Sequence, residues 1–477
     1  MESFYFYDLE TTGRDPRWHR VIQFAGIRTD AELKPLGEPV SWLVALDDDV
    51  VPEPEAALVT GLAPRDCAGG IDEGELFRRI ASEFGRPGTC VVGFNNLRFD
   101  DEFVRHGFWR NLHDPYAREW QGGNSRWDLI DLARMAAALR PEGIVWPERE
   151  GRRVFRLEDL AAANGIEQLQ AHDAASDVLA TLGLARLLKQ AQPRLFDYYL
   201  SLRNKRVVAD LVLPVGERPF LHVSGRYHGN RNHLALAASV AAHPVNRNSV
   251  VVADLSVDPD SWAGLSAEEL AERLFARQES LGDRQRPPLK EVHLNKVPAV
   301  APLGVLGDPD AGRLGIDMEA CLGHLEHLRQ MPDLVGRIRE VYAPRARTPV
   351  EDVDGELYDG FLPDADRSVL QQLRDADPTA LAAPPPISDP RAGELVFRFR
   401  ARRHPGSLDA GEQELWAEQV RDRLTRGRPG MASVAEARER IDRLRAQVDP
   451  GANRVLEGLD AHLAGLVERW GLPGTGR

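Results

Sequence analysis

The stretch that decides the fold of the N-terminal part is Phe4-Tyr5-Phe6-Tyr7-Asp8-Leu9-Glu10-Thr11-Thr12-Gly13. Its first half is aromatic and apolar, which predicts a buried strand over residues 3–9. Side chains two residues apart on a strand point to the same face, so Asp8 and Glu10 are expected side by side where the apolar segment ends. Two carboxylates this close repel each other, and both have raised pKa values unless a cation lies between them. The alternative is a polar strand end before a Thr-Gly turn.

Similar patterns predict the rest of this first domain. Three strands followed by alternating helices and a strand indicate a mixed α/β sheet covered by helices. Pro193 marks the expected end of the domain. The apolar periodicity predicts further strands over 21–29, 41–45 and 90–94, and helices over 60–85, 100–109, 129–139, 157–164 and 174–190.

Two later segments carry further acidic side chains. In the first, a short buried strand runs into a polar turn and then reaches Asp100 and Asp101 near the start of a helix. In the second, Asp177 falls in the first turn of an apolar helix and His172 in the loop before it. Capping of a helix N-terminus is the alternative role for Asp100, Asp101 or Asp173. A lone histidine is more often structural than catalytic.

Beyond Pro193 the pattern changes. Short β-like stretches predict a second, β-containing domain over residues 194–347, and a helical domain is expected over 348–477, which leaves 1–193 as the first domain. Residues 345–354 form a candidate linker, residues 382–390 an irregular loop, and Ser433 with Glu436 a capping box for a helix through Arg445. In the second domain we expect strands over 207–213, 220–223, 249–255 and 292–294 and a helix over 267–281.

The composition limits the class of protein. The chain has 477 residues, enough for two or three domains, and 43% of them are hydrophobic. No run approaches the roughly 18 to 20 apolar residues that span a bilayer. The N-terminus lacks the pattern of a signal peptide. Cys67, Cys90 and Cys321 have neither metal-ligand nor disulfide spacing. We therefore predict a reduced, cytoplasmic protein with no membrane partner.

The charge pattern leaves a nucleic-acid partner open. The formal net charge of −14 argues against phosphate binding at first sight. The local field of a groove matters more than the total charge, however, and residues 194–252 contain eight Arg or Lys against three Asp or Glu. This segment is a candidate binding surface, with an ordinary solvated surface as the alternative.

Taken together, the acidic motifs resemble a known group of enzymes. The order Asp-x-Glu, then an Asp about 90 residues further, then His-x4-Asp about 70 beyond that, is similar to the DEDDh 3′→5′ exonucleases. Longer segments resemble one bacterial family within that group, exodeoxyribonuclease I, and the matches run from residue 4 to beyond 410. They include Phe94-Asn95-Asn96-Leu97-Arg98-Phe99-Asp100-Asp101-Glu102, His243-Pro244-Val245-Asn246-Arg247-Asn248 and Tyr358-Asp359-Gly360-Phe361.

The resemblance implies a fold and a reaction. It implies a ribonuclease H-like mixed-sheet exonuclease domain, an SH3-like domain and a helical C-terminal domain. It also implies 3′→5′ degradation of single-stranded DNA to 5′-mononucleotides in DNA repair and recombination. Asp8, Glu10 and Asp177 would hold two Mg²⁺ ions, for which Mn²⁺ could substitute, and Asp100 would complete the second ion site. His172 would be the general base, since its ordinary pKa of about 6.5 suits that role.

The resemblance also implies contacts and partners. Arg156 would contact substrate near the scissile phosphate, although an ion pair with Glu158 is the alternative. Glu10 would contact substrate as well as metal. The acidic C-terminal tail of the single-stranded-DNA-binding protein is the implied protein partner of a monomeric enzyme. Further candidates for DNA contacts are Arg105, Tyr116, Trp120, Arg134, Tyr198, Lys205, Asn248, Lys290, Tyr358 and Phe361. For the aromatic residues among them, packing in the core is the alternative.

Two other functions remain open at this point. One is a DEDDh exoribonuclease that trims RNA, although such enzymes usually lack two further domains. The other is a catalytically silent DNA-binding scaffold that kept the nuclease fold. Retention of all four acidic residues and the histidine argues against the scaffold.

Overall fold

The computed structural model describes residues 2–168, 173–344 and 352–473. The chain divides into two compact units. The first consists of Met1–Ser125, Gln168–Leu179 and Thr348–Arg477, and the second of Arg126–Glu167 and Ala180–Arg347. The N-terminal and C-terminal thirds of the chain therefore belong to one unit, which holds all four candidate acidic residues.

The sheet of the N-terminal region is mixed, as predicted. β1 pairs antiparallel with β2 and parallel with β4, and β2 pairs antiparallel with β3. The strand order is β3-β2-β1-β4-β5, and the division between the two units falls within β5. The strands are β1 (Ser3–Thr11), β2 (Val21–Thr29), β3 (Val40–Leu43), β4 (Thr89–Gly93) and β5 (Ser125–Asp128).

The alternation along β1 separates the core from the candidate site. Tyr5, Tyr7 and Leu9 belong to one hydrophobic cluster that also contains Phe24 and Phe84. Asp8 and Glu10 have the opposite parity, so they project from the other face of the strand. The aromatic side chains thus fix the strand in the core, and the two carboxylates lie on its opposite face.

Three helices cover this region of the first unit, and one of them differs from the prediction. The helix expected over 60–85 begins only at Glu73, because Gly61, Pro64 and a Gly-Gly pair interrupt the earlier part and Asp72 caps the new start. The helices are α1 (Pro54–Thr60), α2 (Glu73–Phe84) and α3 (Asp100–Arg110), with the short 3-10 turns η1 (Pro64–Cys67), η2 (Asn96–Arg98), η3 (Ala117–Glu119) and η4 (Gln121–Gly123).

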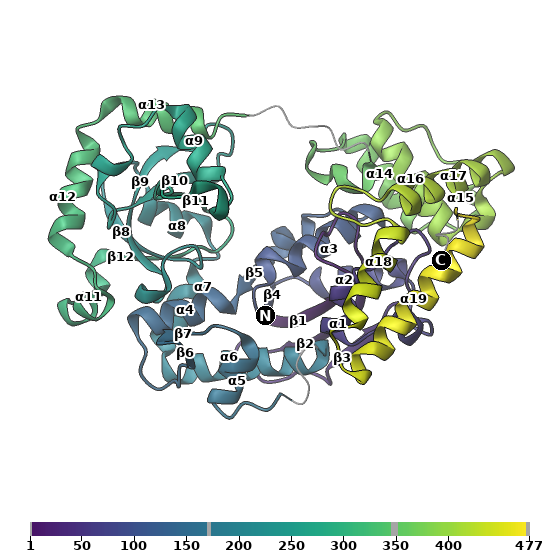
Figure 1. Ribbon diagram of the computed structural model, residues 1–477, viewed down its shortest axis with the longest axis horizontal. Coiled ribbons are helices and arrows are strands. Elements are labelled where there is room, and N and C mark those ends of the chain that lie inside the picture. Colours follow the sequence, from purple (N-terminus) through teal and green to yellow (C-terminus); the bar gives the residue numbers. More distant parts are fainter. Residues whose placement is uncertain (1, 169–172, 345–351, 474–477) are drawn as a thin grey trace. The chain divides into compact units, whose positions relative to one another are not determined.

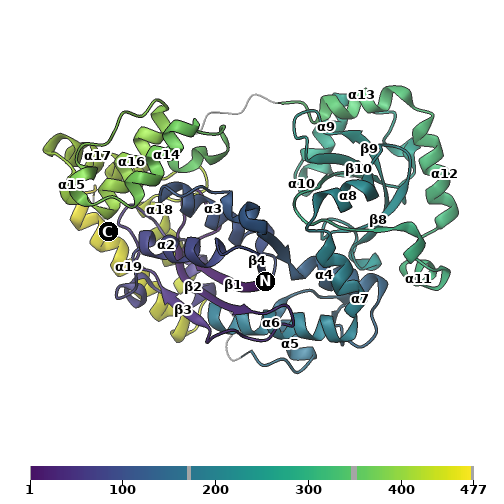
Figure 2. The same cartoon turned by 180° about the vertical axis from the view of Figure 1, so that it is seen from behind.

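The C-terminal part is helical, as predicted, and packs on the N-terminal part of the same unit. α19 lies along α1 and α18 (Figures 1 and 2). Trp18 and Val51 share a hydrophobic cluster with Leu459 and Leu463. The capping box at Ser433 is confirmed. The elements are η8 (Val353–Tyr358), α14 (Asp364–Arg374), α15 (Pro378–Leu381), α16 (Pro390–Arg403), η9 (Pro405–Ser407), α17 (Ala410–Arg426), α18 (Val434–Arg445) and α19 (Pro450–Trp470).

Part of the predicted linker is buried. Residues 345–351 lie outside the described residues, but Asp352 and Asp354 are 3% and 0% exposed. Arg423 donates to Asp352 at 2.9 Å, and Arg402 donates to Asp354 at 2.6 Å and to Asp49 at 2.8 Å. The interpretation of residues 352–354 as linker is therefore wrong. Burial of these aspartates depends on arginines that lie far along the chain, which the local sequence does not reveal.

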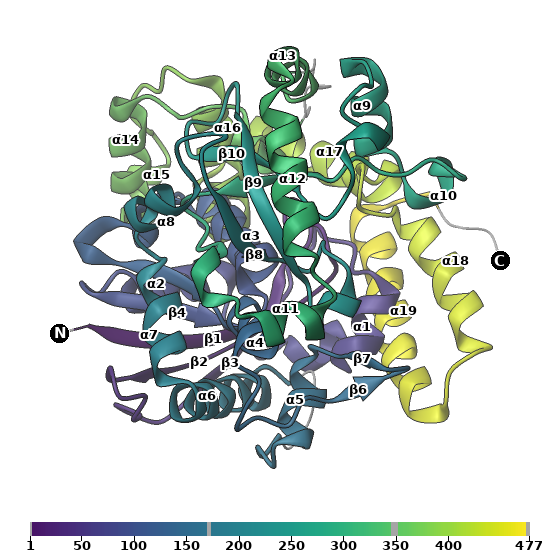
Figure 3. The ribbon, with the colours of Figure 1, turned by 90° about the vertical axis from the view of Figure 1, so that its left-hand side faces the viewer.

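The second unit contains a five-stranded sheet in the order β11-β10-β9-β8-β12. Each strand of this sheet runs antiparallel to its neighbours. Helices α8 (Lys205–Val212), α12 (Met318–Arg329) and α13 (Pro332–Val341) pack against strands of this sheet (Figure 3). β9 was not predicted, because its run of Leu and Ala has few β-branched residues. The strands are β8 (Pro219–Val223), β9 (Leu234–Ala242), β10 (Ser249–Asp254), β11 (Leu289–His293) and β12 (Ala299–Pro302).

The strand predicted over 207–213 is wrong. Residues 207–212 belong to α8 (Lys205–Val212), and Leu213 is its C-cap. Asn204 caps the helix by accepting from the backbone of Arg206, and Val208 and Val212, four residues apart, are buried. The valines suggested a strand, but the N-cap and the four-residue spacing favour a helix.

The helix predicted over 267–281 is split into α9 and α10. The other boundaries are α4 (Leu129–Leu139), β6 (Glu148–Arg149), β7 (Arg152–Arg153), α5 (Leu157–Ala163), α6 (Ala174–Ala191), α7 (Pro193–Ser201), η5 (Gly229–Arg231), η6 (Pro259–Ser261), α9 (Ala267–Phe275), α10 (Gln278–Leu281), η7 (Leu303–Val305), α11 (Asp308–Leu314), α12 (Met318–Arg329) and α13 (Pro332–Val341).

Two further observations concern the cysteines and the apolar character of the helices. The cysteines Cys67, Cys90 and Cys321 are free and buried. Within residues 2–168, 173–344 and 352–473, no helix combines the length and the apolar character that crossing a bilayer requires.

Candidate active site

Three carboxylates from two elements converge in the first unit. Asp8 and Glu10 project from one face of β1, and Asp177 lies in the first turn of α6. One carboxylate oxygen of each lies within 4.8 Å of one from each of the others. Glu10 is only 7% exposed. The sequence therefore predicted correctly that distant segments bring these side chains together.

The two adjacent aspartates at the start of α3 have different surroundings. Asp101 is fully buried and accepts from the Tyr7 hydroxyl at 2.7 Å and from Arg118 Nη2 at 2.8 Å. The negative charge of Asp100 instead acts on both Asp8 and Glu10. The N-cap of α3 is Phe99, so the interpretation of either aspartate as the cap is wrong. Asp101 anchors the helix, and Asp100 belongs to the carboxylate group.

The N-terminus of α6 is held against strand β2. Gln23 Nε2 donates to Asp173 Oδ1 at 2.9 Å, while Asp173 Oδ2 accepts from the backbone of Ser176 at 3.2 Å. The capping role considered for Asp173 is therefore confirmed. Gln168 Nε2 donates to Asp177 Oδ1 at 2.6 Å.

Sequence reasoning missed Gln23 and Gln168. The signal for Gln23 is its position directly opposite Glu10 in the antiparallel pair of β1 and β2, which becomes visible only when the strands are paired. The proposed base, His172, lies outside the described residues.

The electrostatics of the cluster favour a cation. Burial, followed by the charges of Asp100, Glu10 and Asp177, raises the pKa of Asp8 well above its ordinary value. Burial, followed by the charges of Asp177 and Asp100, raises the pKa of Glu10 to about 9. A divalent cation would offset this repulsion, and a donor set made only of carboxylate oxygens suits a hard ion. The residues present thus fit the ion that the motifs imply.

Four of the candidate DNA contacts form one cluster in the first unit. The Arg105 guanidinium lies 5.7 Å from the centre of the Tyr116 ring, whose edge meets Phe361 with the ring centres 5.9 Å apart. Arg105 also donates to the Tyr358 hydroxyl at 3.2 Å and forms ion pairs with Glu102 and Glu119.

Aromatic surface at this cluster is accessible. Phe361 is 81% exposed, and the candidate Trp120, four residues after Tyr116, is 65% exposed. Tyr116 and Phe361 border a cavity of about 530 Å³ that also reaches Trp109, His113 and Arg374. Exposed aromatic rings at the rim of such a cavity are suited to stacking with nucleobases.

The candidates in the second unit make contacts of their own. Lys205 Nζ donates to Asn248 Oδ1 at 3.2 Å, so these two form one polar pair. Lys290 lies 3.3 Å from His222 Nε2 and over the ring of Tyr227. The hydroxyl of Tyr198 donates to the backbone carbonyl of Val300 at 2.8 Å.

The two arginine candidates differ in exposure. The Arg134 side chain is 15% exposed, pairs with Asp131 at 2.9 Å and lies over the ring of Phe155. The Arg156 side chain is 64% exposed and lies 3.9 Å from Glu158, the alternative partner considered for it. An exposed pair at that distance is weak, so the Arg156 guanidinium remains able to contact a phosphate.

Comparison with known proteins identifies the family. The chain is 44% identical over 429 residues to exodeoxyribonuclease I of Escherichia coli strain K12, covering 89% of this chain and 90% of the relative. The chain belongs to the exodeoxyribonuclease I family. Family models for an exonuclease, an exonuclease I SH3-like domain and an exonuclease I C-terminal domain match residues 5–185, 203–344 and 351–466. The activity is that of an exodeoxyribonuclease, a hydrolase.

Solved structures of the family share the whole fold. Exonuclease I from Methylocaldum szegediense is 46% identical with a TM-score of 0.92, and the match covers 98% of this chain and 100% of that one. A zinc-bound form of the E. coli exonuclease I complex with single-stranded DNA is 40% identical with a TM-score of 0.93, at the same coverage. The predicted ribonuclease H-like, SH3-like and C-terminal domains are confirmed.

Proposed function

We propose that the chain degrades single-stranded DNA from its 3′ end and releases 5′-mononucleotides, using two Mg²⁺ ions held by Asp8, Glu10, Asp177 and Asp100. The convergence of Asp8, Glu10 and Asp177 within 4.8 Å carries this proposal. The electrostatic influence of Asp100 on two of them supports a fourth member. Mn²⁺ also accepts oxygen donors and is expected to substitute.

The side chains have separate tasks in this reaction. When bound, the divalent ions would activate water and neutralise charge on the leaving 3′-oxygen. Asp8 and Glu10 are fixed by β1, so their carboxylates are oriented before substrate arrives. Gln168 and the capped start of α6 hold Asp177. His172 would take the proton of the attacking water as general base.

The substrate class follows from the family and from the aromatic candidates. Its E. coli relative has been solved with single-stranded DNA. In this chain Tyr116, Trp120, Tyr358 and Phe361 offer stacking surfaces, and Lys205, Lys290 and Arg156 offer cations for phosphates. Arg105, Arg134, Tyr198 and Asn248 are proposed as further DNA contacts.

Digestion of 3′-labelled oligonucleotides tests the proposal. We expect Mg²⁺-dependent release of 5′-mononucleotides from single-stranded DNA, no release in EDTA, and slower loss of RNA of equal length. The Asp177→Asn variant should bind DNA and release nothing. Faster loss of RNA would favour the exoribonuclease, and DNA binding by the wild type without any product under excess Mg²⁺ would favour the silent scaffold.

A second experiment addresses the base. His172→Ala should lower kcat by about 10² to 10⁴-fold, the usual contribution of a general base, while divalent-ion binding is retained. Activity that is unchanged in this variant would exclude His172 from the role. Loss of ion binding would instead place the histidine in the metal site.

The proposal also covers the domain boundaries, the oligomeric state, the cellular location and the protein partner. We infer domain boundaries near residues 193 and 347, a monomeric state, a cytoplasmic location and a role in DNA repair and recombination. The acidic tail of the single-stranded-DNA-binding protein is the proposed protein partner, and a labelled peptide of that composition should bind the full-length chain. Sedimentation of the protein alone tests the monomer.

A further inference from the structure

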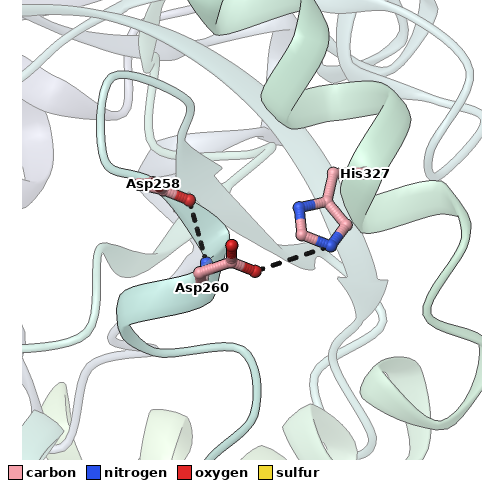
Figure 4. A group of neighbouring side chains, drawn as sticks. All are labelled: Asp258, Asp260 and His327. Atoms are coloured by element: carbon pink, nitrogen blue, oxygen red, sulfur yellow. Dashed lines mark hydrogen bonds and ion pairs between the residues drawn. The ribbon is translucent and has the colours of Figure 1, made fainter.

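A second group of metal-ligating side chains lies in the second unit, apart from the carboxylate cluster. Figure 4 shows Asp258, Asp260 and His327 pointing toward one another. Each offers a ligand atom within 4.8 Å of those of the other two, and His327 Nε2 lies 3.6 Å from Asp260 Oδ1. The aspartates flank the start of η6, and His327 lies in the last turn of α12.

The spacing of these atoms suits a single ion. Zinc binds imidazole nitrogen and carboxylate oxygen at about 2.0 to 2.2 Å, so two ligands of a tetrahedral ion lie about 3.4 Å apart. The separation of 3.6 Å between His327 and Asp260 is close to that value. Because Asp260 and His327 are 76% and 39% exposed in their side chains, small rotations can bring the third ligand in and water can fill a fourth position.

The backbone around the ligands is fixed. Asp258 Oδ1 accepts from the backbone of Asp260 at 3.0 Å, and Ser261 Oγ donates to the Asp258 carbonyl at 2.7 Å. Trp262, which follows η6, is 3% exposed. On the other side, His324 Nδ1 lies 2.8 Å from the Leu255 carbonyl one turn before His327 in α12. The backbone segments that carry the ligands are therefore already ordered, so less conformational entropy is lost when an ion binds.

The charges around the group also favour a cation. In the part of the chain that the structure describes, His327 is the only ion-pair partner within 4.0 Å of Asp258 or Asp260. Nearby acids are paired differently: Glu326, next to His327, forms an ion pair with Arg329 at 3.0 Å. Two carboxylates beside one imidazole leave a local excess of negative charge that a divalent cation would offset.

We propose that Asp258, Asp260 and His327 form a second metal site, selective for Zn²⁺ and related transition-metal ions over Mg²⁺. The imidazole nitrogen gives this preference, because Mg²⁺ takes oxygen ligands almost exclusively whereas Zn²⁺ accepts nitrogen and oxygen together. Among the described residues, the carboxylate cluster at Asp8 offers only oxygen donors. The site joins η6 to α12, so a bound ion stabilises the second unit without taking part in hydrolysis.

Metal binding to the full-length protein tests the proposal. The background is the double variant Asp8→Asn with Asp177→Asn, which removes two ligands of the carboxylate cluster. Equilibrium dialysis against Zn²⁺, with the metal counted by mass spectrometry, should find one tightly held ion per chain. Adding His327→Gln or Asp260→Asn should weaken Zn²⁺ binding at least about tenfold, because each removes one of three protein ligands.

A matched control and a second readout make the result decisive. Glu319→Gln removes an exposed acid from the same helix and should leave binding unchanged. Zn²⁺ should raise the thermal midpoint of the background protein but not of the His327→Gln protein. Co²⁺ in place of Zn²⁺ should show a ligand-field spectrum that His327→Gln abolishes. Absence of a bound ion in the background protein, or equal binding after His327→Gln, would overturn the proposal.

Discussion

Gln23 Nε2 donates to Asp173 Oδ1 at 2.9 Å and so joins strand β2 to the start of α6. Gln23 lies opposite Glu10 in the paired strands, and Asp173 caps the helix whose first turn carries Asp177. Gln23 therefore connects β2, the partner of the strand that carries Glu10, to the helix that carries Asp177. We expect the geometry of the carboxylate cluster to depend on this connection.

Replacing Gln23 tests this connection. Gln23→Met keeps the length of the side chain but removes the donor, so Asp177 should lose its fixed position. We expect Mg²⁺ to bind about 10- to 100-fold more weakly, the usual effect of losing a group that orients a metal ligand. Gln23 makes hydrogen bonds with Asp173, Ser41 and the backbone of Ala174, so the free energy of unfolding should fall by no more than the loss of these three, about 3 kcal/mol. Titration of activity against Mg²⁺ measures the affinity for the ion, and calorimetry measures the stability. An unchanged dependence on Mg²⁺ would contradict the role of Gln23 in positioning Asp177.

The adjacent aspartates of α3 should respond in opposite ways. Asp101→Asn weakens the acceptor of Tyr7 and of Arg118 in a fully buried position, so it should destabilise the protein by about 2 to 4 kcal/mol. Asp100→Asn removes one member of the carboxylate cluster and should leave stability intact while reducing kcat at least about 10²-fold. Urea unfolding and single-turnover kinetics on both variants check this. Equal effects of the two substitutions on stability would contradict the assignment.

Removing a carboxylate from the metal-free cluster should not harm folding. Asp8, Glu10 and Asp177 repel one another when no cation offsets their charge, so Asp177→Asn relieves repulsion. In EDTA the thermal midpoint of Asp177→Asn should equal or exceed that of the wild type. Added Mg²⁺ should raise the wild-type midpoint and leave that of the variant nearly unchanged. A variant that unfolds earlier in EDTA would indicate a structural aspartate.

The buried ion pairs of the first unit should be essential for stability. Arg402 is 3% exposed in its side chain and holds Asp49 and Asp354, which are both buried. Arg402→Met would leave two carboxylates without this partner and should cost about 3 to 5 kcal/mol. Arg426→Met is the matched control, because its pair with Asp422 is on the surface, and should cost no more than about 1 kcal/mol. Urea midpoints of the two variants measure the difference; similar values would show that the buried network contributes little.

The same network predicts how stability depends on pH. Burial alone would raise the pKa of Glu73, but the guanidinium groups of Arg110, Arg20 and Arg403 outweigh it and lower that pKa to about 2. The folded-state pKa lies below the ordinary value of about 4.3, so the stabilisation is complete above pH 4.3 and is lost as the pH falls toward 2.

Glu73→Gln provides the check on this window. The variant should be less stable than the wild type at pH 7, and the difference should shrink as the pH falls from about 4.3 to 2. Unfolding by urea at a series of pH values measures both curves. A difference that stays constant across that interval would mean that Glu73 is not held as a carboxylate by its arginines.

Local patterns in the sequence determined much of the architecture. The aromatic run of β1 predicted the buried strand, and strand parity, which is a local property, placed Asp8 and Glu10 on one face. The spacing of the acidic motifs led to the family, and with it to the three domains. The helix that begins after Ser433, which has a capping box, was also predicted within a residue.

Long-range pairing decided what local patterns could not. Asp100 and Asp101 are identical in type and adjacent, and only the positions of Tyr7 and Arg118 distinguish the anchor from the candidate ligand. The valines of α8 suggested a strand because propensity is weaker than capping and tertiary packing. The part of the expected linker at Asp352 and Asp354 is buried because arginines about 50 to 70 residues later neutralise it.

By itself the sequence determined which residue types could perform the chemistry and which strand would present two of them, since these follow from side-chain identity and backbone periodicity. Only the tertiary structure decided which carboxylates face one another, what holds α6 in place and which charges are buried. Those properties depend on distances between segments far apart in the chain, and the packing of the whole unit sets such distances.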